Sequence, residues 1–368
     1  MVLDARVQYI FLYNFLLLLT LGVFLSYIGR TGRYVPRSYE SKRYTVFLLL
    51  FMIVIIGWRD WIDPLFVDSA GYGLRFSRIH SLSDDVWGGK SKLFNGLYVY
   101  WAYFNLSPEL FFIFSAMVYC LPMYYLSCKI GKNYSFIVLL FFATNFIWYS
   151  FGVNGIRNGW AFAMILWAIY YWNKNILFFL FLFLFLAYCI HGSSILTIGA
   201  ILVSKFFPKP KFILLFWFLS FIFSLLVGRY VEDIFLRYDF ISSEGQGYLA
   251  EELTTIDPSV FSYTGFRWDF LIYSSIPVFW GYYAIVKNKA TDLYYNFIYG
   301  TYVLANAIWV LVIRSNYSNR IASLSWFLIP LVFAYPLVRM NTFKNRNRVL
   351  AIVILLYYLF AYFMWIRS

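Results

Sequence analysis

About twelve runs of apolar residues, each long enough to cross the roughly 30 Å hydrocarbon core of a bilayer, dominate this chain. They lie near residues 9–28, 44–58, 109–128, 134–150, 155–173, 175–190, 193–207, 211–228, 268–286, 293–313, 320–339 and 348–366. Because 62% of the 368 residues are hydrophobic and only 13% are charged, a water-soluble domain could not bury this apolar surface. The sequence therefore predicts an all-α fold in which residues 1–368 form a single integral membrane domain with about 12 transmembrane helices.

Two longer polar segments, 59–108 and 229–267, interrupt the apolar runs. Within the first segment, the piece 93–104 is rich in apolar and aromatic residues, and we expect it to form an interfacial or re-entrant helix. The second segment is acidic and is expected to act as a lid or as a binding loop for a polar substrate.

Basic residues are concentrated in alternate connections between the apolar runs. These connections contain Arg30, Arg33, Arg37, Lys42, Arg43, Lys129, Lys132, Lys174, Lys205, Lys209, Lys211, Lys287, Lys289, Arg339, Lys344, Arg346 and Arg348. They hold 17 of the 30 Lys and Arg residues and two acids, Glu40 and Asp292. Because basic connections are retained in the cytoplasm, this pattern places both termini and both long polar segments outside.

The net charge of +13 is therefore expected to reflect membrane topology, and we predict no nucleic-acid partner. The three cysteines, Cys120, Cys128 and Cys189, lie in or beside apolar runs without the spacing of metal ligands. The only histidines are His80 and His191, so a polyhistidine metal site is also not expected. The sequence thus predicts neither a metal nor a cofactor.

The polar residues of the first long segment begin directly after an apolar run, in residues 57–76. Arg59, Asp68 and Tyr72 belong to this cluster, which also contains Asp60, Asp63 and Arg75. One interpretation is a solvated loop whose acids cap helices. The other is a surface cluster that orients a polar substrate, with Asp68 as the best candidate for a carboxylate base or an acceptor for sugar hydroxyls.

Arg157 and Asn158 stand at the start of the apolar run 155–173, between two glycines. A helix N-terminus with a guanidinium group favours phosphate oxygens, and the glycines would let the backbone approach something bulky. The alternative is an arginine whose charged group extends to the membrane interface, which is common at helix ends.

Three further cationic positions are expected on the outer side. Arg314 and Arg320 flank a five-residue polar turn, where membrane topology disfavours arginine, so an anion-binding role is predicted for both. Arg267 could join them or pair with Asp269. His191 ends an apolar run and could be a structural hydrogen-bonding residue, a general base or a phosphate donor.

Several arginines at the outer mouth of an apolar bundle fit a substrate that carries one or two phosphates, because guanidinium groups bind phosphate bidentately and keep their charge. A lipid tail lying between helices would hold such a substrate at the membrane. An Asp-x-Asp pair typical of a nucleotide-sugar site is absent from the predicted cytoplasmic face. A lipid-linked donor is therefore favoured over a soluble nucleotide sugar.

Four short motifs in this order resemble the EpsG family, a group of bacterial exopolysaccharide and O-antigen polymerases of the Wzy type. The matching residues are Gly57, Arg59, Asp68, Tyr72, Arg157, Asn158, Ala161, His191, Ser193, Arg314 and Arg320. Two positions depart from the family pattern, since Asn158 stands where glutamine is frequent and Val67 stands where glycine precedes the aspartate.

The resemblance implies a bundle similar to C-type glycosyltransferases, located in the bacterial inner membrane with its active site facing outward. Such an enzyme would transfer a growing glycan from undecaprenyl diphosphate to a lipid-linked repeat unit without a metal ion. Its partners would be undecaprenyl diphosphate-linked oligosaccharides, membrane lipids and a chain-length regulator protein. A transporter or flippase for lipid-linked glycan is the alternative, and an acyltransferase using His191 is a third option.

By the same resemblance, Arg157, Arg314 and Arg320 would hold the donor diphosphate, with Arg267 as a further member. Asp68 or His191 would deprotonate the acceptor hydroxyl. Arg59, Tyr72 and Asn158 would shape the acceptor side.

Overall fold

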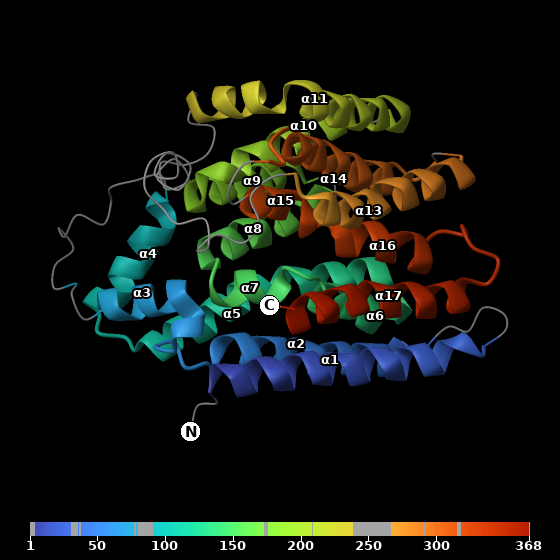
Figure 1. Cartoon of the computed structure of the whole chain (residues 1–368). Helices are drawn as coiled ribbons and strands as arrows, with labels where there is room; N and C mark the ends of the chain where they lie inside the picture. Colours follow the sequence, from blue (N-terminus) through green and yellow to red (C-terminus); the bar gives the residue numbers. More distant parts are fainter. Residues whose placement is uncertain are drawn as a thin grey trace. The chain divides into compact units, whose positions relative to one another are not determined.

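The computed structural model describes residues 4–30, 36, 38–76, 79, 91–172, 176–207, 209–237, 266–289, 291–314 and 318–367. Every regular element within these ranges is a helix (Figure 1), which confirms the all-α prediction for the described part of the chain. The chain divides into two compact units. The first unit comprises Met1–Ile190 and Phe333–Ser368, and the second comprises His191–Val332.

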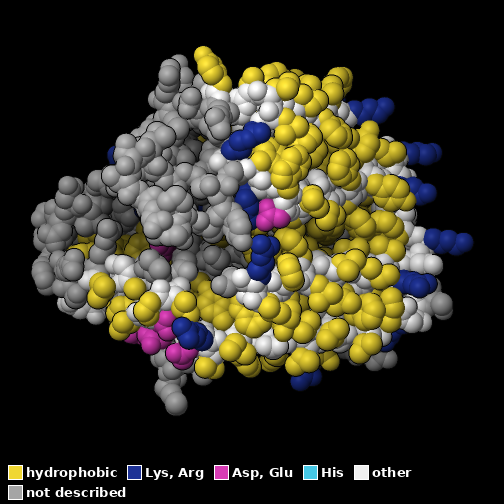
Figure 2. Space-filling model, viewed as in Figure 1, with side chains coloured by type: hydrophobic (Ala, Val, Ile, Leu, Met, Phe, Trp, Pro, Cys, Tyr) yellow, Lys and Arg dark blue, Asp and Glu magenta, His cyan; other side chains and the backbone are white. Residues whose placement is uncertain are grey.

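The protein is a polytopic membrane protein. Five stretches of the described residues are long and apolar enough to cross a membrane, namely Ala5–Ile28, Pro108–Ala143, Pro210–Gly228, Arg320–Val338 and Arg346–Arg367. Hydrophobic side chains cover most of the described surface in view in Figure 2, as expected for helices that face lipid.

The prediction of about twelve spans was wrong, because several apolar runs form short or broken helices. The run 134–150 gives α6 (Ser135–Ala143) and α7 (Trp148–Val153), separated by a turn. In that turn the Asn145 side chain accepts a hydrogen bond from the backbone N–H of Ile147, which replaces a helical bond. The apolar run 175–190 yields only 14 helical residues, Leu177–Ile190, which form α9.

The first unit is a bundle of packed helices. Its elements are α1 (Ala5–Ile28), α2 (Ser38–Gly57), η1 (Pro64–Phe66), α3 (Val67–Phe76), α4 (Lys92–Tyr103), α5 (Pro108–Gly131), η2 (Lys132–Tyr134), α6, α7, α8 (Ile156–Trp172), α9 and α17 (Arg346–Arg367). α1 packs against α17, α2 against α5 and α6, and α8 against α5 and α9. The piece 93–104 falls on the 12-residue helix α4, which packs against α9; its interfacial or re-entrant position stays a prediction.

Basic residues gather at one end of the first unit, which we call its basic end. Arg339 Nη2 lies 3.4 Å from the backbone oxygen of Lys129, and the Arg346 guanidinium lies 4.8 Å from the Tyr134 ring centroid. Tyr13 of α1 stacks on Trp365 near the end of α17, with 4.7 Å between ring centroids. The described chain ends of this unit therefore lie at the opposite end, on one side, as the distribution of charges predicts.

The second unit is built around α14 (Leu293–Leu311), which is buried along most of its length. The surrounding elements are η3 (Gly192–Ser194), α10 (Ile195–Phe206), α11 (Pro210–Arg237), α13 (Trp268–Lys287) and α15 (Ser318–Trp326), while α16 (Ile329–Val338) contains the boundary between the units. Two of its buried polar side chains are paired across helices. Trp217 Nε1 donates to Asn306 Oδ1 at 2.8 Å, and Thr197 Oγ1 donates to the Leu324 carbonyl at 2.7 Å. Such bonds satisfy polar groups that lipid cannot solvate.

Candidate functional site

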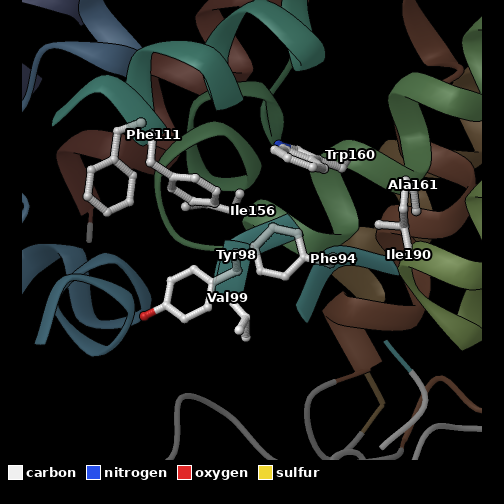
Figure 3. Packing of buried hydrophobic residues seen from close by; sticks show 9 residues of the cluster. Phe94, Tyr98, Val99, Phe111, Ile156, Trp160, Ala161 and Ile190 are labelled. Atoms are coloured by element: carbon white, nitrogen blue, oxygen red, sulfur yellow. The ribbon is translucent and has the colours of Figure 1, made fainter. Parts of the chain in front are cut away.

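An aromatic cluster supports the end of the first unit that lies opposite the basic end. It consists of Phe94, Tyr98, Val99, Phe111, Phe112, Ile156, Trp160, Ala161 and Ile190, which come from α4, α5, α8 and α9. Figure 3 shows rings from three of these helices facing one another, and the Phe94 and Trp160 ring centroids are 5.1 Å apart. This cluster packs the first turns of α4, α5 and α8 together. We call this end of the first unit the loop end.

Asp68 lies in the first turn of α3, where its side chain is exposed. The partial positive charge of a helix N-terminus stabilises a carboxylate at this position. One helical turn later, the Tyr72 ring packs against Phe94 and Tyr98, and its carbonyl accepts a hydrogen bond from the Tyr98 hydroxyl. Tyr72 therefore anchors α3 on the aromatic cluster, and Asp68 stands at the edge of that anchored helix.

Arg59 is buried, with 3% of its surface exposed. Its Nε and Nη2 atoms donate to Ser69 Oγ at 3.2 and 2.7 Å, Nη1 donates to the Ile56 carbonyl, and Nη2 donates to the Val153 carbonyl at 3.3 Å. The guanidinium carbon lies 4.4 Å from the centroid of the Phe112 ring. The Ser69 hydroxyl donates in turn to the Val153 carbonyl.

This network joins three segments at the loop end: the last turn of α2, the start of α3 and the end of α7. Burial lowers the pKa of Arg59 to about 9, so the group remains a cation near neutral pH. The resemblance to the EpsG family assigned Arg59 to the acceptor side of the site. In the structure its N–H groups donate hydrogen bonds to other residues of the protein. Because Ser69 is adjacent to Asp68, Arg59 holds the turn of α3 that carries the candidate base.

The segment that follows α7 leads directly to Arg157. The Asn154 side chain donates to the Leu65 carbonyl at 3.2 Å, and α8 begins at Ile156, which is buried in the aromatic cluster. Arg157 and Asn158 lie in the first turn of α8 and are half-buried. The first unit therefore brings all five of its predicted site residues, Arg59, Asp68, Tyr72, Arg157 and Asn158, to its loop end.

The glycines around Arg157 are explained by packing within the chain. A Cβ atom at Gly155 would lie 2.5 Å from the Phe151 ring, and one at Gly159 would lie 2.5 Å from the Phe151 carbonyl oxygen. We expected these glycines to let the backbone approach a bulky group. The group that lies against both of them is Phe151.

Arg314 lies in the turn after α14 in the second unit and reaches across to α11. Its Nη1 atom donates to the Ser224 carbonyl, and its guanidinium carbon lies 4.8 Å from the Phe266 ring centroid. A Cβ atom at Gly228 would lie 2.4 Å from Nη1, so the missing side chain at this position of α11 lets the guanidinium approach closely. The neighbours of Arg314, which are Ser224, Gly228 and Phe266, were not identified from the sequence. Of these, only Gly228 could have been noticed in the sequence, because it is a glycine within an apolar run.

Arg267 forms the ion pair that the sequence left as an alternative. Its Nε and Nη2 atoms lie 3.0 and 2.8 Å from the two carboxylate oxygens of Asp269, and its guanidinium carbon lies 3.8 Å from the Phe270 ring centroid. An anion at Arg267 would have to share the guanidinium group with this carboxylate.

His191 is an extended, half-buried residue immediately before η3, and Arg320 is exposed in the first turns of α15. η3 contacts α15, so the segments that carry these two residues adjoin. The turn residues 315–317 lie outside the described residues, as do residues 238–265, which include most of the acidic loop.

Together these features define a polytopic membrane protein in which ionisable and guanidinium groups are positioned at helix ends. Residues 42–368 match the model of the EpsG family, and the chain belongs to this family. Membership indicates a role in polysaccharide biosynthesis. Comparison with curated proteins and with solved structures gives no match.

Proposed function

We propose that the protein is a glycosyltransferase that polymerises lipid-linked oligosaccharides. It would transfer a growing glycan from undecaprenyl diphosphate to a lipid-linked repeat unit. Family membership supports this proposal, and the observation that carries it is the joint placement of Asp68 and Arg157 at the loop end of the first unit. A carboxylate and a guanidinium at the same end of one unit would supply a base and a diphosphate ligand.

In the proposed reaction, Asp68 or His191 takes the proton from the acceptor hydroxyl. The acceptor oxygen then forms a bond to the anomeric carbon of the donor glycan, and the bond from that carbon to the diphosphate oxygen breaks. The electron pair leaves with the diphosphate, whose growing negative charge is stabilised by Arg157, Arg314 and Arg320. Tyr72 and Asn158 border the acceptor side, and Arg59 holds the base in position.

The proposed location is the bacterial inner membrane, with the reaction at its outer face. In the first unit, Lys129, Arg339 and Arg346 gather at the basic end, and in the second unit Lys205 and Lys287 lie in the last turns of α10 and α13. Because basic segments are retained in the cytoplasm, the loop end faces outward, where the lipid-linked repeat units would be polymerised.

The test is incubation of the purified protein with lipid-linked repeat units, followed by separation of the products. The unaltered protein is expected to give a ladder of longer glycans, and Arg157→Ala is expected to leave single repeat units. Arg348→Ala is the matched control, because Arg348 also lies in the first turn of a helix, α17, but at the basic end. Normal elongation by Arg157→Ala would refute the proposed diphosphate site.

A transporter or flippase for lipid-linked glycan is the second candidate. The observation that favours it is the break between α6 and α7 at residues 144–147, because interrupted membrane helices are typical of transporters. Reconstituted vesicles distinguish the two functions: a transporter would move labelled lipid-linked repeat units between leaflets without lengthening them.

A further inference from the structure

A groove of about 720 Å³ lies in the second unit, bounded by α10, α11 and α14. α10 contacts α14, and α11 also contacts α14 (Figure 1). On α10 the groove is lined by Ile195, Gly199 and Val203, which recur every four residues and therefore share one face of the helix. Leu304 and Ile308 line it from α14 with the same spacing. The groove is thus an apolar channel along the axis of α10.

The groove is open in its middle. A Cβ atom at Gly199 would meet no atom within 4 Å, and Ile195 and Val203 are 44% and 45% exposed. The neighbouring helix α11 is a candidate span in which only 28% of the apolar stretch Pro210–Gly228 is buried. Its surface therefore suits contact with lipid, and the groove is accessible to a chain of the same chemistry.

The length of the groove matches one leaflet of a bilayer. From Ile195 to Phe207 the chain advances twelve residues, and at about 1.5 Å per residue this corresponds to about 18 Å. Half of a hydrocarbon core of about 30 Å is about 15 Å. An acyl chain of one leaflet would thus fill the groove from one end to the other.

The only charged side chain in the lining is Lys209, at the end where α10 stops and α11 begins. Its ammonium group lies 5.8 Å from the Phe212 ring centroid, and Lys205 and Lys211 belong to the same connection. The sequence 205–211 contains no acid. A lysine cluster at the membrane surface attracts anionic lipid headgroups, while its aliphatic stems remain among apolar groups.

We infer that this groove binds one acyl chain of an anionic phospholipid, with the lipid phosphate on Lys209. The complementary positive charge lies at the C-terminal end of α10, remote from His191, which places the lipid headgroup at that end of the second unit. This site is separate from the proposed polymerase residues, and the inference does not depend on the polymerase function.

The test measures lipid retained by the purified full chain, using native mass spectrometry after addition of phosphatidylglycerol or phosphatidylcholine. The unaltered protein is expected to retain phosphatidylglycerol preferentially. Gly199→Phe fills the open middle of the groove and is expected to reduce retention about tenfold, corresponding to about 1.4 kcal/mol. Lys209→Gln is expected to weaken phosphatidylglycerol binding about fivefold, since one lysine at a membrane surface contributes about 1 kcal/mol.

Two substitutions serve as matched controls and are expected to leave retention unchanged. Gly22→Phe introduces the same side chain on α1, where a Cβ atom also meets nothing within 4 Å. Lys287→Gln removes a lysine from the last turn of α13, which does not line the groove. If Gly199→Phe fails to fold, Val203→Trp fills the same groove from the next turn of α10.

Equal retention of the two phospholipids would overturn the inference, as would unchanged retention after the groove is filled. Undecaprenyl phosphate is added as a third lipid in the same experiment. Retention of that lipid alone, lost on Gly199→Phe, would assign the groove to a polyprenyl chain and refute the phospholipid site.

Discussion

Replacing Arg59 by methionine tests whether this arginine positions the candidate base or binds the acceptor. The methionine side chain fills much of the same volume and keeps contact with the Phe112 ring, but it removes every donor of the guanidinium group. The Ile56 carbonyl, in the last turn of α2, then loses the donor provided by Arg59. The Val153 carbonyl keeps the hydroxyl of Ser69 as its donor.

The magnitude follows from these contacts. Hydrogen bonds to charged groups contribute about 1.5–3 kcal/mol each, and a buried acceptor left without a donor costs about 1–3 kcal/mol. Removal of a buried cation offsets part of this loss, because its desolvation cost disappears. We expect Arg59→Met to lower the free energy of unfolding by about 2–4 kcal/mol.

Thermal unfolding in detergent and the elongation assay together decide the role of Arg59. If Arg59 positions Asp68, Arg59→Met lowers both stability and kcat, while KM for the acceptor changes little. Ser69→Ala is expected to change the same two quantities in the same direction, to a smaller extent. The double variant should show a coupling energy of about 0.5–3 kcal/mol, as contacting residues do.

A normal unfolding temperature combined with a raised KM for the acceptor would refute the positioning role. That result would return Arg59 to the acceptor side. Asp60→Asn controls for charge changes in the same loop, because Asp60 lies next to Arg59 in sequence but outside its hydrogen-bond network.

The remaining predictions concern the residues around the proposed reaction. Asp68→Asn and His191→Asn identify the base: the variant that removes it should lower kcat about 10²–10⁴-fold and abolish the corresponding limb of the pH–rate profile, while the other keeps that limb. Arg314→Ala should reduce elongation about 10²-fold or more, as loss of a charge-stabilising donor does. Elongation equal to that of the unaltered protein would exclude Arg314 from the diphosphate site. Arg267→Ala should reduce elongation less than Arg314→Ala, because Arg267 already pairs with Asp269; a larger loss would show that its charge acts on the substrate. Gly228→Ala should reduce elongation less than Arg314→Ala in the same assay, since the added methyl group shifts the guanidinium tip but keeps its charge; a loss as large as that of Arg314→Ala would show that the exact position of the guanidinium is critical.

The sequence by itself determined the class of this protein and the end of the helices at which its charges lie. Long apolar runs and alternating basic connections are local properties of the chain, and lipid permits only helices or closed barrels to span it. The gathering of Lys129, Arg339 and Arg346 at one end of the first unit agrees with that charge pattern. The short helix at 93–104 was also foreseeable, because its apolar length is insufficient to span a membrane.

Only the tertiary structure decided which apolar runs form continuous helices and what each polar residue contacts. Hydropathy could not reveal that the Asn145 side chain replaces a backbone bond and interrupts the run 134–150. Arg59 and Arg157 both stand at the boundary of an apolar run, yet one is buried among Ser69 and two carbonyl groups while the other is half-buried at a helix start. The physical reason is that a guanidinium group is buried only where hydrogen-bond acceptors surround it. Some of these acceptors, such as the Val153 carbonyl, belong to residues distant in sequence and come near only when the helices pack.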